Sequence, residues 1–207
     1  MNALDKAKQR SFQYWFEDGL NEMGIGCLLI LLGFYFYLGA VLPQNGILRT
    51  ILDISLLLVI PGGAWLVSRG VKYFKEKITY PRTGYVALAQ KRRAPLWLAG
   101  GISGLAGAFF AAIVIQGNLL QWIPALTGII FCLVFVFIAA RVNLLRFFIL
   151  ASISLAIGIA ISMGDFGLSE GTSAVYFSLG LVVLVSGACN LAKYLRQTPA
   201  VKDPSHE

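Results

Sequence analysis

Six apolar stretches, each about twenty residues long, constrain the fold of this 207-residue sequence more than any other feature. An α-helix rises 1.5 Å per residue, so it needs roughly 20 apolar residues to cross a hydrocarbon core of about 30 Å. The stretches are residues 24–42, 50–68, 94–116, 120–140, 142–163 and 173–192. The sequence therefore predicts an all-α polytopic membrane protein with six transmembrane helices, in which residues 1–207 form a single integral membrane domain.

The distribution of basic residues predicts how these helices are oriented. All seventeen Lys and Arg residues except Arg49 lie before the first stretch, after the second, after the sixth, or at the turn between the fourth and fifth, where Arg146 falls at the start of the fifth stretch. Cytoplasmic connections of membrane proteins are enriched in Lys and Arg, so both termini and the basic connection 69–93 are expected in the cytoplasm. The net charge of +7 then reflects topology and contact with anionic lipid headgroups. Nucleic acid is not an expected partner, because its recognition requires a basic stripe with interleaved aromatic residues on a soluble surface.

Residues 1–23 are predicted to form an amphipathic helix at the membrane surface. Phe12, Trp15, Phe16, Leu20 and Met23 recur at three- and four-residue spacing, which places them on one helix face. The remaining positions are polar: Lys6, Lys8, Arg10, Gln13, Glu17, Asp18, Asn21 and Glu22. Such a helix could anchor the first span, sense the membrane surface or dock a partner.

The second span holds the first candidate site. Asp53 is the only acidic residue in the six predicted spans, and an ionisable group at membrane depth suggests function. The sequence Pro61-Gly62-Gly63 predicts a kink or break that could expose carbonyl groups to a cation or solute. Oxygens from other spans could contribute: Thr127, Ser178, Ser186 and Asn190. The alternative is structural, with Asp53 paired to Arg49 four residues earlier and a kink without a ligand.

The connection after the second span holds the second candidate site, the segment TYPRTGYV at residues 79–86. Pro81 and Gly84 favour a turn, and the flanking Ile78 and Tyr80 favour extended backbone, so a small hairpin is expected. Its remaining candidate residues are Arg82 and Tyr85. Together with Tyr80 they could recognise a lipid headgroup or a partner protein, or they could simply anchor the segment at the interface.

The third span carries small residues at every fourth position: Gly100, Gly104, Ala108 and Ala112. This spacing lets two helix backbones approach closely, which drives association in lipid. Weaker versions occur in the fifth span (Ser154, Gly158, Ser162) and in the sixth (Gly180, Gly187). We expect these residues to form packing seams within one chain, with a homo-oligomer as the alternative.

The sequence lacks the components of common enzyme classes. The string Gly101-Ile102-Ser103-Gly104 resembles the nucleophile motif of rhomboid intramembrane proteases, but the only histidine of the chain is His206. There is no HExxH motif or phosphate-binding loop, and the three cysteines have no metal-ligand spacing. The expectation is a non-enzymatic protein with no catalytic residues, no cofactor and no metal.

Two stretches carry a resemblance to a family. YWFEDGLNE at residues 14–22 and TYPRTGYV at residues 79–86 resemble the start and a cytoplasmic loop of a family of small bacterial multi-pass inner-membrane proteins without an assigned activity. The resemblance implies a bacterial inner-membrane location and carries over no functional residues. The expected function is an accessory or scaffold component that binds lipid or a partner protein, with a small transporter or channel as the alternative.

Overall fold

The computed structural model describes residues 16, 18–43, 46–80, 120–142, 144–164 and 166–198. These residues form five long helices and two short helical segments, and no β-strand occurs among them. The elements are α2 (Leu20–Val41), α3 (Ile47–Phe74), the π-helix η1 (Lys75–Thr79), the 3-10 helix η2 (Leu120–Trp122), α6 (Ile123–Val142), α7 (Leu145–Ser162) and α8 (Leu168–Gln197). The five long helices, α3 taken together with η1, are long and apolar enough to cross a membrane.

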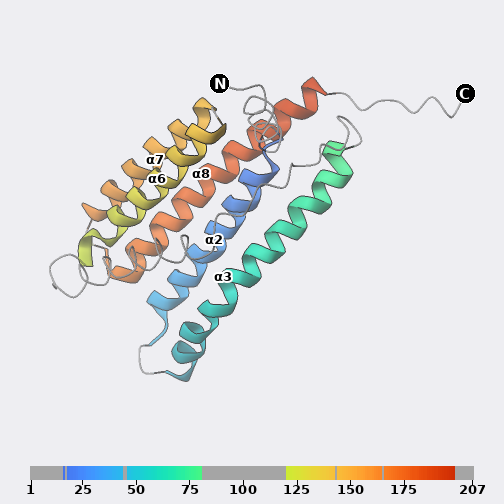
Figure 1. Cartoon of the computed structure of the whole chain (residues 1–207). Helices are drawn as coiled ribbons and strands as arrows, with labels where there is room; N and C mark the ends of the chain where they lie inside the picture. The colour runs from blue at the N-terminus through green and yellow to red at the C-terminus, as the bar shows by residue number, and fades with distance from the viewer. Residues whose placement is uncertain are drawn as a thin grey trace, which may run out of the picture.

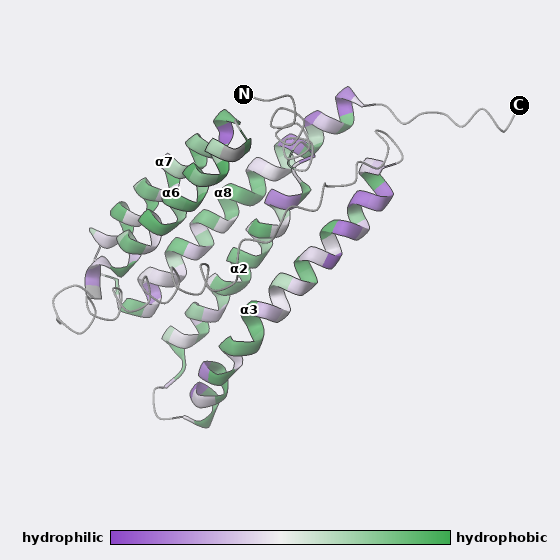
Figure 2. Ribbon diagram, viewed as in Figure 1, coloured by the Kyte–Doolittle hydropathy of each residue, from purple (hydrophilic) through white to green (hydrophobic). Residues whose placement is uncertain are grey.

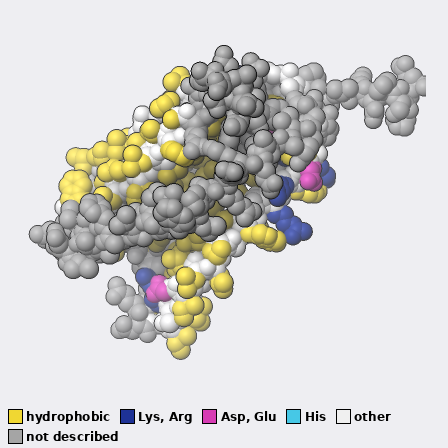
Figure 3. Space-filling model, in the orientation of Figure 1, with side chains coloured by type: hydrophobic (Ala, Val, Ile, Leu, Met, Phe, Trp, Pro, Cys, Tyr) yellow, Lys and Arg dark blue, Asp and Glu magenta, His cyan; other side chains and the backbone are white. Residues whose placement is uncertain are grey.

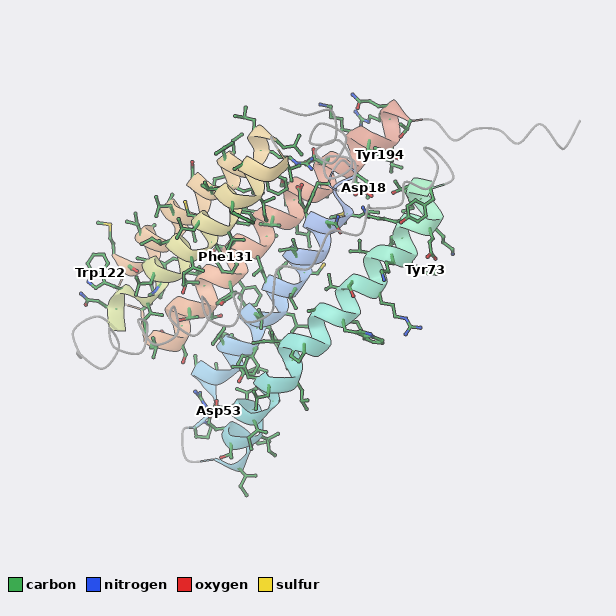
Figure 4. All side chains as sticks on the ribbon, viewed as in Figure 1. Asp18, Asp53, Tyr73, Trp122, Phe131 and Tyr194 are labelled. Carbon is green, nitrogen blue, oxygen red and sulfur yellow. The ribbon has the colours of Figure 1, made fainter. Side chains whose placement is uncertain are left out.

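The helices form an antiparallel bundle with α2 and α8 at its centre (Figure 1). The pair α6 and α7 covers one side of this centre, and α3 lies on the other side, against α2. Figure 4 labels Asp18 and Tyr194 at one end of the bundle, which we call the termini end, and Asp53 and Trp122 at the other, which we call the distal end. The described chain begins and finishes at the termini end.

Glycines allow α2 and α8 to approach closely. A Cβ added at Gly26 would lie 2.7 Å from the Leu184 nitrogen, and one added at Gly180 would lie 2.8 Å from the Ile30 nitrogen. The predicted role of Gly180 in intramolecular packing is therefore confirmed. Gly158 of α7 likewise lies where its Cβ would be 2.9 Å from the Cα of Gly128 in α6. Close backbone approach of this kind stabilises helix pairs in lipid, where apolar contact alone contributes little.

Among the described residues, the central hydrophobic cluster lies where α2, α6, α7 and α8 meet, and α3 contributes only the buried Val71, outside this cluster. Its centre includes Leu29, Phe135, Phe147, Leu179 and Val183. Figure 2 shows hydrophobic residues along all five helices, those of α3 included. Large side chains of α3 remain exposed along its length: Ile47, Leu48, Ile51, Ile54, Leu57, Leu58, Ile60, Trp65, Leu66, Tyr73 and Phe74. α3 is therefore a peripheral, apolar helix.

Two sequence-based expectations about helix limits are wrong. The amphipathic helix was expected to continue to residue 23, but Gly19 has a φ of 71° and α2 starts after it, at Leu20. A side chain at Gly19 would also collide with the carbonyl of Gly187, so both the backbone turn and the packing require glycine here. Glu22 consequently belongs to α2 and turns with its buried face.

The second helix also continues past its predicted end at residue 68. α3 and η1 extend the helical backbone to Thr79, and Tyr80 is helical too, so Ile78 and Tyr80 are not extended as expected. The buried side chains of Lys75 and Thr79 both contact Asp18, and this tertiary anchoring outweighs the weak strand preference of the segment. The first part of the basic connection 69–93 is therefore helix.

Several predicted features lie outside the described residues. They are most of the amphipathic helix (residues 1–15), the loop residues Pro81, Arg82, Gly84 and Tyr85, and the third span (residues 94–116) with Gly100, Gly104, Ala108 and Ala112.

Candidate functional site

A cleft of about 420 Å³ opens at the distal end, between α2, α3, α6 and α8. We call it the distal cleft. Its lining combines aromatic, hydroxyl-bearing, aliphatic and charged residues: Tyr35, Phe36, Gly39, Arg49, Leu52, Asp53, Leu56, Ile123, Thr127, Leu168, Ser169, Thr172 and Tyr176. The candidate residue Asp53 therefore lies in a cavity of the size that small ligands occupy, roughly 300–1,000 Å³.

The two charged residues of the distal cleft pair with one another. The Nε atom of Arg49 lies 3.2 Å from Oδ1 of Asp53, which confirms the pairing predicted from their four-residue spacing. Arg49 also donates a hydrogen bond from Nη1 to the carbonyl of Gly39 in α2. The side chain of Asp53 remains 58% exposed, against 25% for Arg49. The carboxylate is thus held in place and still open.

Hydroxyl groups of the distal cleft donate to nearby carbonyls. Thr127 Oγ1 donates to the Ile123 carbonyl at 2.9 Å, and Thr172 Oγ1 donates to the Leu168 carbonyl at 2.8 Å. Tyr35 donates from its hydroxyl to the carbonyl of Leu52 in α3, at 3.0 Å. Together with the Arg49 bond to Gly39, the Tyr35 bond fastens α3 to α2 at the distal end.

The structure does not bring Pro61, Gly62 and Gly63 into the distal cleft. α3 runs as one helix through Pro61, so the expected break is absent, and none of the three residues lines the cleft. Outside its own helix turn, no described atom lies within 4 Å of a Cβ built on Gly62, whereas one built on Gly63 would meet the side chain of Leu28 in α2. Of the oxygens expected to join Asp53 from other spans, Thr127 lines the cleft, while Ser178, Ser186 and Asn190 do not.

A second group of polar residues is buried at the termini end. Asp18 and Glu22 are each only 1% exposed, although the sequence pattern placed both on the polar face of a membrane-surface helix. We call this group the termini-end cluster: Asp18, Glu22, Lys75, Thr79, Arg146, Ser186 and Asn190. The expectation about the two acidic residues is wrong, because α2 begins at Leu20 and packs against α8.

Asp18 connects the N-terminal end of α2 to η1. Its Oδ2 atom lies 3.1 Å from Nζ of Lys75 and accepts a hydrogen bond from Oγ1 of Thr79 at 3.1 Å. Its Oδ1 atom accepts a hydrogen bond from the backbone nitrogen of Leu20, at 3.2 Å. The π-helical geometry of η1 accompanies this contact, as Lys75 and Thr79 are the two buried residues of that segment.

Glu22 connects α2 to α7 and α8. Its Oε1 atom lies 2.8 Å from Nη2 of Arg146, and its Oε2 atom accepts hydrogen bonds from Ser186 Oγ at 3.2 Å and from Asn190 Nδ2 at 3.4 Å. Arg146 also donates to the backbone carbonyl of Phe16. A buried charge is tolerated when it is paired and hydrogen-bonded, and both carboxylates of the cluster meet that condition.

The spacing of polar residues in the sequence carries a signal for this cluster, which the periodicity of apolar residues does not contain. Asp18 and Glu22 are four residues apart, and so are Ser186 and Asn190. Ser186 and Asn190 therefore share one face of α8, whereas Asp18 precedes the turn at Gly19 and lies outside α2, and Arg146 lies near the start of a predicted span. Polar residues at matching depths on several helices are candidates for contact in a bundle.

The distal cleft and the termini-end cluster have different chemical capacities. The cleft offers an open carboxylate and hydroxyl oxygens, whereas the charges of the cluster are paired with one another. Among the described residues, no group of three or more His, Cys, Asp or Glu side chains could hold a metal ion.

The fold defines the class of this protein: it is an α-helical membrane protein. Comparison with protein-family models, with curated proteins and with solved structures finds no match for the chain.

Proposed function

We propose that this protein is a small, non-enzymatic membrane transporter that binds a polar solute in the distal cleft. The observation that carries the proposal is the position of Asp53, an exposed carboxylate in a cleft of about 420 Å³ formed by four apolar helices. Ionisable groups inside membrane domains commonly mark the paths of solutes and ions. The Pro61-Gly62-Gly63 segment has no part in this proposal.

The proposed topology has six spans with both termini in the cytoplasm of a bacterial cell. Support comes from the directions of the helices: η1 finishes at the termini end, whereas η2 begins at the distal end (Figure 1). The chain between them joins opposite ends of the bundle, which in a bilayer requires another crossing, and residues 94–116 are predicted to supply it. The distal cleft then faces away from the cytoplasm, and the basic termini end meets anionic lipid headgroups.

Transport would proceed by exposing the site alternately to the two sides of the membrane. The described residues give no support for an open pore. The core residues Leu29, Phe135, Leu179 and Val183 lie in the bundle between the distal cleft and the termini-end cluster. α3 is the candidate moving element, since it packs mainly on α2 and is fastened to it by polar contacts at the distal end, with Lys75 and Thr79 holding Asp18 at the other end. Release of α3 from its contacts at one end would change the access of solutes to the cleft.

The direct test uses proteoliposomes loaded with a defined mixture of small amines, amino acids, sugars and carboxylates. Mass spectrometry measures which solutes remain inside after dilution. We expect one class to escape faster than from protein-free liposomes, and Asp53→Asn to slow that escape. Glu76→Gln is the matched control, because Glu76 is an exposed acid of η1 at the opposite end of the same helical segment.

Two results would overturn the transport proposal. If liposomes with the wild-type protein retain every solute class as well as protein-free liposomes do, the protein transports none of these solutes. The second test uses a Ser169→Cys variant of a protein in which Cys27, Cys132 and Cys189 are changed to Ser. If this variant fails to react with a water-soluble maleimide, the cleft is closed to water. Ser169 is a suitable reporter because it lines the cleft and is partly exposed.

A second candidate function is an accessory or scaffold component, and the exposed apolar surface of α3 favours it. On the face drawn in Figure 3, the described side chains are mostly hydrophobic, and the few charged side chains in view lie in two separate groups. The partner would be another membrane protein or a second copy of this chain. Mild extraction into nanodiscs followed by mass spectrometry tests this candidate. A stoichiometric partner that is lost in Tyr80→Ala, Arg82→Ala or Tyr85→Ala variants supports it, and a chain recovered alone contradicts it.

A further inference from the structure

We propose that the distal cleft is selective for small organic ammonium ions, such as primary alkylamines in their protonated form. This inference rests on the proposed role of the cleft in solute binding, and it names the chemical class of the solute. Three features of the lining carry it: the committed hydroxyl donors, the charge that remains open, and the aromatic and aliphatic walls.

Three of the five hydroxyl groups that line the distal cleft already donate their protons to backbone carbonyls. Thr127, Thr172 and Tyr35 each donate to a backbone carbonyl, at 2.9, 2.8 and 3.0 Å respectively. A hydroxyl has one proton and two acceptor lone pairs, so each of these oxygens keeps only acceptor capacity for a ligand. The cleft is therefore rich in acceptors, and a ligand that brings its own donors fits it best.

The charged residues also favour a ligand that donates hydrogen bonds. Arg49 already donates to Asp53 and to the carbonyl of Gly39, and its side chain is 25% exposed. Asp53, at 58% exposure, has further lone pairs available, because a carboxylate accepts about four hydrogen bonds. An incoming ammonium group has three donors and a positive charge, so it can bind Asp53 without displacing Arg49. An anion could use the remaining N–H groups of Arg49, but the more exposed carboxylate of Asp53 would repel it.

The walls of the cleft suit the organic part of such a ligand. Phe36 stacks on Tyr176 with ring centroids 5.2 Å apart, and Tyr35 meets Phe36 edge to face at 5.4 Å. Aromatic faces attract a cation placed within about 6 Å of the ring centroid. The aliphatic lining residues Leu52 and Leu56 offer apolar surface to a short alkyl chain.

The test compares three probes of nearly equal shape: n-butylammonium, n-butyrate and 1-butanol. The full-length protein is placed in nanodiscs at neutral pH, and binding is followed as the shift of the unfolding temperature with probe concentration. We expect a shift with n-butylammonium and little or none with the other two. Since a hydrogen bond to a charged group contributes about 1.5–3 kcal/mol, Asp53→Asn should weaken n-butylammonium binding by about tenfold or more.

Two further variants distinguish a loss of binding from a loss of folding. Glu76→Gln removes the same charge at the other end of the segment and should bind n-butylammonium as the wild type does. Thr172→Val preserves the charge of Asp53 but removes an acceptor oxygen, so its binding should weaken by a smaller factor. The unfolding temperature without probe shows that each variant is folded.

The remaining outcomes separate this inference from the proposed function. Equal or stronger binding of n-butyrate or 1-butanol overturns ammonium selectivity, and so does n-butylammonium binding that Asp53→Asn leaves unchanged. If the liposome assay shows escape of sugars or carboxylates alone, transport stands and the ammonium inference falls. If no solute class escapes, the proposed function itself falls.

Discussion

The two polar regions of this protein use the same kind of ion pair in different surroundings. In the distal cleft, Arg49 and Asp53 are 25% and 58% exposed, whereas Lys75 and Asp18 at the termini end are 3% and 1% exposed. Exposed pairs contribute little to stability, because water already solvates each charge. A buried pair holds its elements together, since losing one partner leaves an unpaired charge out of water. The open pair is therefore free to serve a ligand, and the buried pairs serve the fold.

The largest expected effect comes from breaking the pair between Glu22 and Arg146. Arg146→Met leaves the 1% exposed carboxylate of Glu22 without its cation, so the free energy of unfolding should fall by about 3–5 kcal/mol. Denaturant titration of the detergent-solubilised protein, followed by circular dichroism, measures this. The double variant Glu22→Gln with Arg146→Met should recover much of the loss, because no unpaired buried charge remains. A loss as small as that of an exposed pair would show that Glu22 is solvated in the membrane.

A smaller effect is expected at Thr79, which donates to the same carboxylate as Lys75. Thr79→Val keeps the shape and removes one hydrogen bond to a charged group, so stability should fall by about 1.5–3 kcal/mol. The same titration measures it, with Thr198→Val as a control, because Thr198 follows the end of α8, donates its hydroxyl to the carbonyl of Tyr194 and is only partly buried. Equal losses in the two variants would contradict the special role of the Asp18 contact.

At the distal end, the bond that fastens α3 to α2 through Tyr35 should contribute less. Tyr35→Phe removes the hydroxyl that donates to the Leu52 carbonyl, and the expected loss is about 0.5–1.5 kcal/mol. Tyr37→Phe is a matched control, because Tyr37 lies two residues away on the same helix and is 51% exposed. A larger loss at Tyr35 than at Thr79 would reverse the comparison between the two ends.

The smallest effect on stability is expected for Asp53→Asn, although this change should have the largest effect on solute binding. The exposed pair with Arg49 should contribute less than about 1 kcal/mol to the free energy of unfolding. Thermal unfolding and the binding assay, performed on one preparation, separate the two readouts. A large loss of stability would identify the pair as structural and remove the reason for treating it as a site.

The long apolar helices could be predicted from composition, but the residues at which they begin and end could not. Apolar stretches predicted α2, α3, α6, α7 and α8, because the length of an apolar run follows from the thickness of the bilayer. The limits of α2 and α3 depended on tertiary contacts: Gly19 turns the chain before α2, and Asp18 holds Lys75 and Thr79 in helical conformation. Neither contact leaves a periodic signal in the sequence.

The candidate sites also combine features that the sequence predicted with features that it did not. The pairing of Arg49 with Asp53 was predictable, because a four-residue spacing on one helix is a local property. The expected combination of Asp53 with Pro61-Gly62-Gly63 did not form in the distal cleft, because a cavity is bounded by whichever helices surround it. Asp18 and Glu22 were assigned to the polar face of a membrane-surface helix, since one amphipathic pattern fits both a surface helix and a helix with a buried polar cluster.

The sequence by itself determined that the chain forms apolar helices suited to a bilayer, that Arg49 pairs with Asp53, and that small residues of α7 and α8 form packing seams. These are properties of composition and of spacing along one helix. Tertiary structure alone decided that Glu22 meets Arg146, Ser186 and Asn190, and that Thr127 and Tyr176 share a cleft with Asp53. The physical reason is that burial and partner choice arise when separate helices meet, and no single helix carries that information.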